Sequence, residues 1–246
     1  MPHAIAGRDA TILVNEIDAS EYLNEYEIER EADDIEVTRF GAIDKEFLSG
    51  PHENTVTLTG HWSGDDAALD TILDATFGVP GDQTCTICPR GAVEGMPAYL
   101  VPLVQTSEDL SAQADDLTED EWEFRASSVR RAVVLQGSDE LITGTTAVVG
   151  TPVIVSALTA KGASAHLHVL SVTGAPTSVL VKVEHSVDGS SWAPLITFPL
   201  VTAAGSARMA TPTTTTVNVQ MRSSVTITGG TTPSVTLALV GARHKR

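Results

Sequence analysis

The chain has 246 residues, which is enough for one large domain or two ordinary domains that each bury a hydrophobic core. Its 32 acidic and 15 basic residues give a formal charge of −17, which argues against ordinary nucleic-acid binding, since such binding depends on Lys and Arg at the phosphates. Only two cysteines are present, so a disulfide framework is excluded.

The negative charge is concentrated in the first part of the chain. Residues 1–137 hold 28 acidic and 8 basic residues, a net charge of −20, whereas residues 138–246 hold 4 and 7, a net charge of +3. The segment 138–149, where the charge changes, is poor in core-forming patterns. We therefore predict a first domain over 1–137, a linker over 138–149 and a second domain over 150–246.

The first half of the chain has the pattern of short strands with one helix. Strands are predicted at 9–14, 16–23, 25–31, 34–40, 53–62, 83–89, 98–105 and 121–128. A helix is predicted over 63–78, with Ser63 as its N-cap and Gly78 at its left-handed exit. Its apolar stripe comprises Leu69, Ile72, Leu73 and Phe77. The acid-rich segment 107–121 is predicted to be a long polar loop.

Three of these strands should each have one apolar face and one polar face, because side chains alternate along a strand. In 25–31 a glutamate stands at every odd position, namely Glu25, Glu27, Glu29 and Glu31. In 53–62 the polar face carries Thr55, Thr57 and Thr59. In 121–128, Glu121 and Glu123 alternate with Trp122 and Phe124. The sequence thus predicts a sheet with an acidic face.

The second half changes to Ser, Thr, Val and Gly with almost no acid. Six strands are predicted there, at 151–159, 165–173, 178–187, 192–200, 215–227 and 233–242. Asp188-Gly189 and Gly229-Gly230 are turn signals between them. Because no helical pattern intervenes, we predict an antiparallel β-sandwich of Ig-like or jelly-roll-like form.

Candidate chemical sites are few, and each has a simpler structural interpretation. Cys85 and Cys88 would point to opposite faces of a strand, which favours buried, reduced thiols over a metal or redox site. His166 and His168 share a strand face but have no evident third ligand, so a polar strand face is favoured over a metal site. The loop 107–121 lacks the ligand spacing of a calcium loop.

Trp192 lies in SVDGSSW, which is one residue short of the Asp-box spacing of some sugar-processing proteins. A plain hairpin with Trp192 over the core is favoured, and a weak carbohydrate contact by Trp192 stays open. Phosphate-binding glycine loops and a nucleophile elbow are absent from the sequence. We therefore predict no catalytic, cofactor-binding or metal-binding residues, and no enzyme activity. A sugar-cleaving enzyme using Glu121 and Glu123 is the least favoured alternative.

The order of features in residues 7–78 resembles the major tail tube proteins of long-tailed, siphovirus-type bacteriophages. The matching features are GRDATILVNEID, the segment 20–23, EYEIERE, DIEVTRFGAIDKEFLSG, ENTVTLTGHW and the helix after it. The resemblance extends over most of residues 7–135. Residues 150–243 look like the extra β-domain that many such tail proteins carry at the C-terminus. The chain departs from the family in its unusually acidic first half and its short N-terminal arm.

The resemblance implies a mainly β protein with a tube-forming domain, one flanking helix and a decorating C-terminal β-sandwich. Subunits of such proteins close into hexameric rings, and the stacked rings conduct the genome through their bore. The implied partners are further copies of the chain and other tail proteins (tape measure, tail terminator and distal tail proteins), with DNA passing without specific binding. The residues expected to face the bore are Glu25, Glu27, Glu29, Glu121 and Glu123. A particle-mounted module that binds host polysaccharide is the alternative.

The expected location is the virion tail, assembled in the cytoplasm of a bacterial host. No apolar run approaches the roughly 18 residues that are needed to cross a bilayer. The first ten residues also lack the basic-then-apolar order of a signal peptide. No membrane partner and no cofactor are therefore expected.

Overall fold

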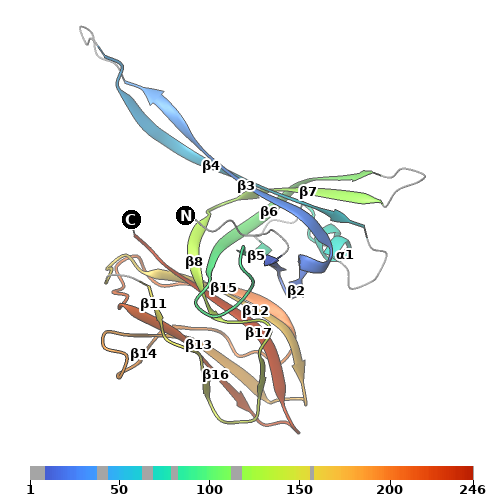
Figure 1. Cartoon of the computed structure of the whole chain (residues 1–246), viewed down its shortest axis with the longest axis vertical. Helices are drawn as coiled ribbons and strands as arrows, with labels where there is room; N and C mark the ends of the chain where they lie inside the picture. Colours follow the sequence, from blue (N-terminus) through green and yellow to red (C-terminus); the bar gives the residue numbers. More distant parts are fainter. Residues whose placement is uncertain are drawn as a thin grey trace. The chain divides into compact units, whose positions relative to one another are not determined.

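The computed structural model describes residues 9–37, 44–62, 69–78, 83–111, 118–155 and 158–245. These residues are mostly β-strand, with one α-helix and two antiparallel sheets (Figure 1), and the predicted mainly β fold class is confirmed. The chain divides into two units. We call residues 22–82 with 102–129 the acidic unit, and residues 1–21, 83–101 and 130–246 the sandwich unit.

The acidic unit contains four antiparallel strands, which belong to the larger of the two sheets. Its strands, in spatial order, are β3 (Leu23–Glu36), β4 (Phe47–His61), β7 (Glu119–Ala126) and the part of β6 (Pro97–Ser111) from residue 102 onward. β3 and β4 form a long hairpin in Figure 1. β7 pairs with β4 only from Thr55 to His61, so the hairpin continues beyond the third strand.

One face of this sheet forms the core of the acidic unit. Val56, Leu58, Trp122 and Phe124 are almost completely buried. Helix α1 (Leu69–Asp74) adds Leu69 and Leu73 to the buried residues. The apolar stripe predicted for the helix is therefore present at these two positions. Phe77, however, is 48% exposed, because the α-helix ends at Asp74 and a turn leads to Gly78. The predicted cap Ser63 lies outside the described residues.

Two sequence predictions for this unit were wrong in their boundaries. Residues 25–31 and 34–36, predicted to lie in two separate strands (25–31 and 34–40), form the single strand β3, in which a register shift between Ala32 and Asp34 absorbs the change in pattern. Residues 38–40 lie outside the described residues. The predicted polar loop 107–121 contains paired strand at both ends, since β6 runs to Ser111 and β7 begins at Glu119. Cross-strand pairing thus outweighs the low strand propensity of acidic residues.

The sandwich unit packs a large sheet against a smaller one. The large sheet has the order β15 (Gly205–Ala210), β12 (Ala163–Thr173), β17 (Ser234–Arg243), β8 (Arg130–Gln136), β6, β5 (Gln83–Cys88), β1 (Thr11–Val14) and β2 (Ile17–Asp18), with β9 (Leu141–Thr143) also on β17. The smaller sheet has the order β10 (Val148–Val149), β16 (Gln220–Thr228), β13 (Ser178–Ser186) and β14 (Ala193–Thr197), with β11 (Val153–Ile154) also on β16. The 3-10 helix η2 (Ala19–Glu21) follows β2.

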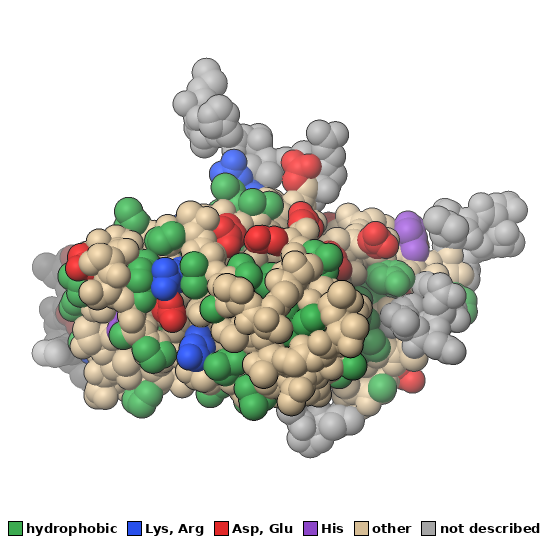
Figure 2. Space-filling view, turned by 90° about the horizontal axis from the view of Figure 1, so that it is seen from below, with side chains coloured by type: hydrophobic (Ala, Val, Ile, Leu, Met, Phe, Trp, Pro, Cys, Tyr) green, Lys and Arg blue, Asp and Glu red, His purple; other side chains and the backbone are tan. Residues whose placement is uncertain are grey.

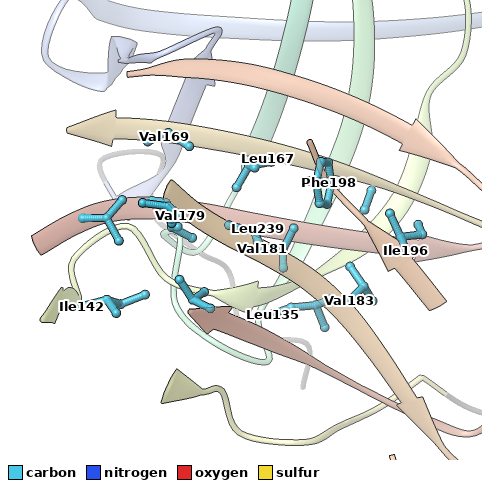
Figure 3. Packing of buried hydrophobic residues seen from close by; sticks show 14 of the residues in the cluster. Leu135, Ile142, Leu167, Val169, Val179, Val181, Val183, Ile196, Phe198 and Leu239 are labelled. Atoms are coloured by element: carbon cyan, nitrogen blue, oxygen red, sulfur yellow. The ribbon is translucent and has the colours of Figure 1, made fainter. Parts of the chain in front are cut away.

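The core of the sandwich unit lies between these sheets. Leu167 and Leu239 come from the large sheet, Val181 and Val183 from the smaller one, and all four are buried in one cluster (Figure 3). Alternation of apolar and polar residues in β13 and β16 places their Val, Met and Ile side chains on the core side. The antiparallel sandwich expected for the second half of the chain is therefore present.

The structure groups the chain differently from the predicted boundaries at 137 and 150. β8, inside the predicted first domain, pairs with β17 near the C-terminus. The predicted linker 138–149 contributes β9, which pairs with β17, and β10, which pairs with β16. Charge and local pattern do not report such long-range pairing. As a division into independently folding domains, the boundaries stay a prediction.

Candidate functional site: an acidic sheet face

The acidic unit displays the predicted glutamates on a single sheet face. The register gives three rows across β3, β4 and β7: Glu25–Thr59–Glu121, Glu27–Thr57–Glu123 and Glu29–Thr55–Arg125. β6 extends the first two rows with Asp109 and Ser107. The sequence predicted which residues share a face within each strand, and the structure shows that the strands are paired in register.

This face is solvent-accessible because the opposite face supplies the core. Glu25, Glu27, Glu29 and Glu121 are exposed, and Glu123 is half-buried. Neighbouring carboxylates on one strand face are about 7 Å apart, which costs roughly 0.6 kcal/mol per pair in water before screening. Screening over about 8 Å at physiological salt lowers that cost further. The charged face is therefore tolerable in a folded protein.

Arg125 is the cation placed within the carboxylates of this face. It forms an ion pair with Glu53, lies 3.7 Å from Glu123, and donates to the hydroxyl of Thr55 at 3.2 Å. A shallow hollow of about 390 Å³ surrounds it, lined also by Glu29 and Glu31. Within the described residues, no group of three or more His, Cys, Asp or Glu side chains could hold a metal ion. The arrangement provides a negative surface rather than a binding pocket.

Asp120 is a carboxylate that sequence reasoning missed. It lies on the core face of the sheet, is 0% exposed, and neither of its carboxylate oxygens has a hydrogen-bond partner among the described residues. Burial, together with the nearby charge of Glu108, raises the pKa of Asp120 to about 7. Burial and the charge of Asp74 also raise the pKa of Glu108. Asp120 stands two residues before Trp122 and four before Phe124, so strand alternation places it on their buried face. This spacing is the sequence feature from which its burial could have been predicted.

We expect Asp120→Asn to stabilise the acidic unit above pH 7. The folded pKa of Asp120 lies above its unfolded value of 3.8, so wild-type stability falls as pH rises from about 4 to about 7. The amide cannot ionise and should remove this loss. Denaturation at pH 5 and pH 8 measures it, with the exposed Asp109→Asn as the control. An equal pH dependence in Asp120→Asn and wild type would contradict the assignment.

His166 and His168 of the sandwich unit lie on a polar strand face, as the sequence predicted, and the structure adds that this face is buried. They are 4% and 0% exposed, and each is hydrogen-bonded. The His168 Nδ1–H donates to the Asn15 carbonyl at 2.7 Å, and the Thr86 hydroxyl donates to His168 Nε2 at 2.8 Å. The His166 Nδ1–H donates to the Cys85 carbonyl at 3.0 Å. The strand face is polar but buried, because β12 lies within the unit and not at its surface.

Acid should destabilise the sandwich unit through this histidine pair. Burial lowers the pKa of His166 to about 3 and that of His168 to about 4, below the unfolded value of 6.5. Each therefore costs about 1.4 kcal/mol of stability per pH unit as pH falls from 6.5 towards 4. Denaturation midpoints between pH 7.5 and 4.5 measure this loss. His168→Gln should flatten the dependence, and an unchanged slope would contradict it.

The remaining sequence candidates have structural roles. Cys85 and Cys88 are buried and free, and burial raises the pKa of the Cys88 thiol to about 12. The Trp192 indole N–H donates to the Gly189 carbonyl at 3.1 Å, within the turn that begins at Asp188. The Arg222 guanidinium lies 4.1 Å from the Trp192 ring centroid and covers one face of the ring. A sugar contact at Trp192 stays a prediction.

No protein-family model matches the chain, and no curated protein matches it. Several solved structures are similar to it. The sheath-tube complex of an extracellular contractile injection system is 19% identical with a TM-score of 0.44, over 54% of this chain and 94% of the other. The SPP1 tail tube is 12% identical with a TM-score of 0.44, over 52% and 78%.

A third similar structure extends over almost the whole chain. It is the SPP1 Dit protein, described as a paradigm of the hub adsorption apparatus in phages that infect Gram-positive bacteria. It is 12% identical with a TM-score of 0.38, over 95% of this chain and 98% of the other. These three similar structures are thus a sheath-tube complex, a tail tube and a hub protein.

Proposed function

We propose that this chain is a structural protein of a phage-type tail, whose copies close into hexameric rings that stack into a tube. The acidic face of β3, β4 and β7 lines the bore, and the genome passes along it. The observation that carries the proposal is a sheet with one buried apolar face, one exposed acidic face and two outer strands that each have one partner in the acidic unit.

The outer strands supply the contacts for a ring. Within the described residues of the acidic unit, β3 pairs only with β4, and β6 pairs only with β7. Outer strands present unpaired N–H and C=O groups, which natural proteins cover, charge or pair. If β3 of one copy pairs with β6 of the next, the sheet closes into a barrel without edges. Every copy then contributes its acidic face to the same side of that barrel.

A negative bore suits a conduit for DNA. Proteins that hold DNA do so mainly by placing Lys and Arg at its phosphates. Carboxylates facing phosphates repel the duplex, so DNA is not retained on its way through. Arg125 is partly neutralised by its ion pair with Glu53 and does not reverse the sign of the face.

Negative-stain microscopy of the purified protein tests the proposal. The protein is imaged over a series of concentrations, alone and with added tail particles that can nucleate its assembly. Rings or tubes of regular diameter are the expected result. A protein that stays monomeric at all concentrations, and is not incorporated when nucleated, would contradict it.

The decorating role of the sandwich unit is part of the proposal and predicts density outside the tube wall.

A further inference from the structure

A basic cleft opens in the sandwich unit. Its volume is about 560 Å³, and four cations line it: Arg90, Arg131, Arg243 and Lys245. No carboxylate is among the described residues that line it. In a chain with 32 acidic and 15 basic residues, such a gathering of like positive charge is an exception.

The four cations share a lack of ion-pair partners among the described residues. Within the described part of the chain, none of them forms an ion pair with a carboxylate. Positive groups placed together repel one another, so incoming carboxylates would relieve that repulsion as well as add attraction. The cleft is therefore suited to an acidic ligand.

The cleft also offers apolar surface and an open strand edge. Ile154 on β11 is 73% exposed, and β11 pairs only with β16 among the described strands. No aromatic side chain is among the described residues lining the cleft, which therefore offer no stacking platform of the kind that single-stranded nucleic acid uses. An extended peptide with both carboxylates and aliphatic side chains fits this surface best.

The acidic unit carries a segment of that chemistry. We call residues 31–36 of β3 with 47–53 of β4 the arm. Ile35 and Leu48 are cross-strand partners. Ile35 is 48% exposed, Leu48 is 58% exposed and Phe47 is 56% exposed. Carboxylates accompany them on β3 at Glu31, Asp33 and Asp34. Figure 2 shows hydrophobic side chains, in green, at the surface of one face of the molecule.

The arm has few packing contacts within its own chain among the described residues. β7 pairs with β4 only from Thr55 onward, so the arm is a hairpin with no third strand among the described residues. A two-stranded hairpin is marginally stable in water without further packing. Exposed apolar side chains on such a hairpin indicate a surface that is covered in an assembly.

We propose that the arm of one copy occupies the basic cleft of a second copy. The carboxylates of the arm lie among the cleft arginines, with Asp33 on the side of the Ile35–Leu48 pair and Asp34 on the opposite side of β3, and the Ile35–Leu48 pair covers Ile154. This contact is distinct from the pairing of β3 with β6 within a ring. The arm–cleft contact rests on the proposed function, because that function brings neighbouring copies together. The contact is a second surface through which these copies associate.

A charge exchange tests the proposal in the full-length chain. Arg131→Glu with Arg243→Glu, and separately Asp33→Lys with Asp34→Lys, should each weaken association at least tenfold by sedimentation, with unchanged circular dichroism. The chain carrying all four changes should recover most of the association. Thr213→Glu with Thr214→Glu, which are exposed and outside the cleft, is the control. Two-change chains that associate like wild type, or a four-change chain that shows no recovery, would overturn the proposal.

Cross-linking separates this contact from tube formation. Because both native cysteines are buried, a Leu48→Cys chain and an Ile154→Cys chain of different mass can be mixed and treated with a short thiol cross-linker. We expect a cross-linked dimer of one Leu48→Cys chain and one Ile154→Cys chain. In the control, Leu200→Cys replaces Ile154→Cys, because Leu200 is 64% exposed and lies outside the cleft. Tubes without the mixed cross-link would refute the arm–cleft contact alone. The mixed cross-link in a protein that never forms rings would refute the proposed tube alone.

Discussion

Trp122→Ala is expected to destabilise the acidic unit by about 3–5 kcal/mol, and with it to abolish assembly. Trp122 is 1% exposed and is the largest of the fully buried side chains. Its removal leaves a cavity under β7, the strand that links β4 to β6 and so holds the two outer strands in one sheet. Urea denaturation followed by circular dichroism measures the loss.

Trp62→Ala is the matched control, because Trp62 is 49% exposed and directly follows the last residue of β4. Its change in the free energy of unfolding should stay below about 1 kcal/mol, as for surface substitutions in general. A loss below 1 kcal/mol for Trp122→Ala would contradict the central place given to this side chain in the sheet.

Replacing Glu25, Glu27 and Glu29 together by lysine should turn a repelling bore into one that retains DNA. All three side chains are exposed, so the fold should survive the change. Particles assembled from this variant should bind short duplex DNA with an affinity that falls steeply with salt. Nuclease protection locates the DNA, since a duplex held inside the bore is shielded from digestion.

Glu21→Lys, Asp139→Lys and Glu140→Lys give the same change of charge on the sandwich unit and serve as the control. Particles of this control should bind DNA outside the bore, where the nuclease can digest it. Equal digestion of the DNA bound by the two variants would contradict a bore lined by β3.

The sequence predicted the acidic face well because the information is local. Strict alternation in 25–31 and 121–125 is enough to assign Glu25, Glu27, Glu29, Glu121 and Glu123 to one side of their strands. The buried partners Trp122 and Phe124 determine which side that is. What the pattern does not contain is the register, by which Thr57 lies between Glu27 and Glu123.

Other features of the fold are decided by distant parts of the chain. The burial of His166 and His168 could not be predicted, because nothing near them in sequence shows that Thr86 and Asn15 pack against them. The linker predicted at 138–149 contains β9 because its partner β17 lies about a hundred residues further along the chain. Asp120 was counted with a polar loop, although its parity with Trp122 indicated burial. Long-range pairing decided each of these outcomes.

The measurement that tests the account most directly is a cryo-electron microscopy map of the assembled particle, at a resolution that shows side chains. It should show the face with Glu27, Thr57 and Glu123 turned towards a water-filled bore, with β3 of each copy beside β6 of the next. A map in which those glutamates lie on the outer surface, or in which Lys and Arg line the bore, would contradict the account.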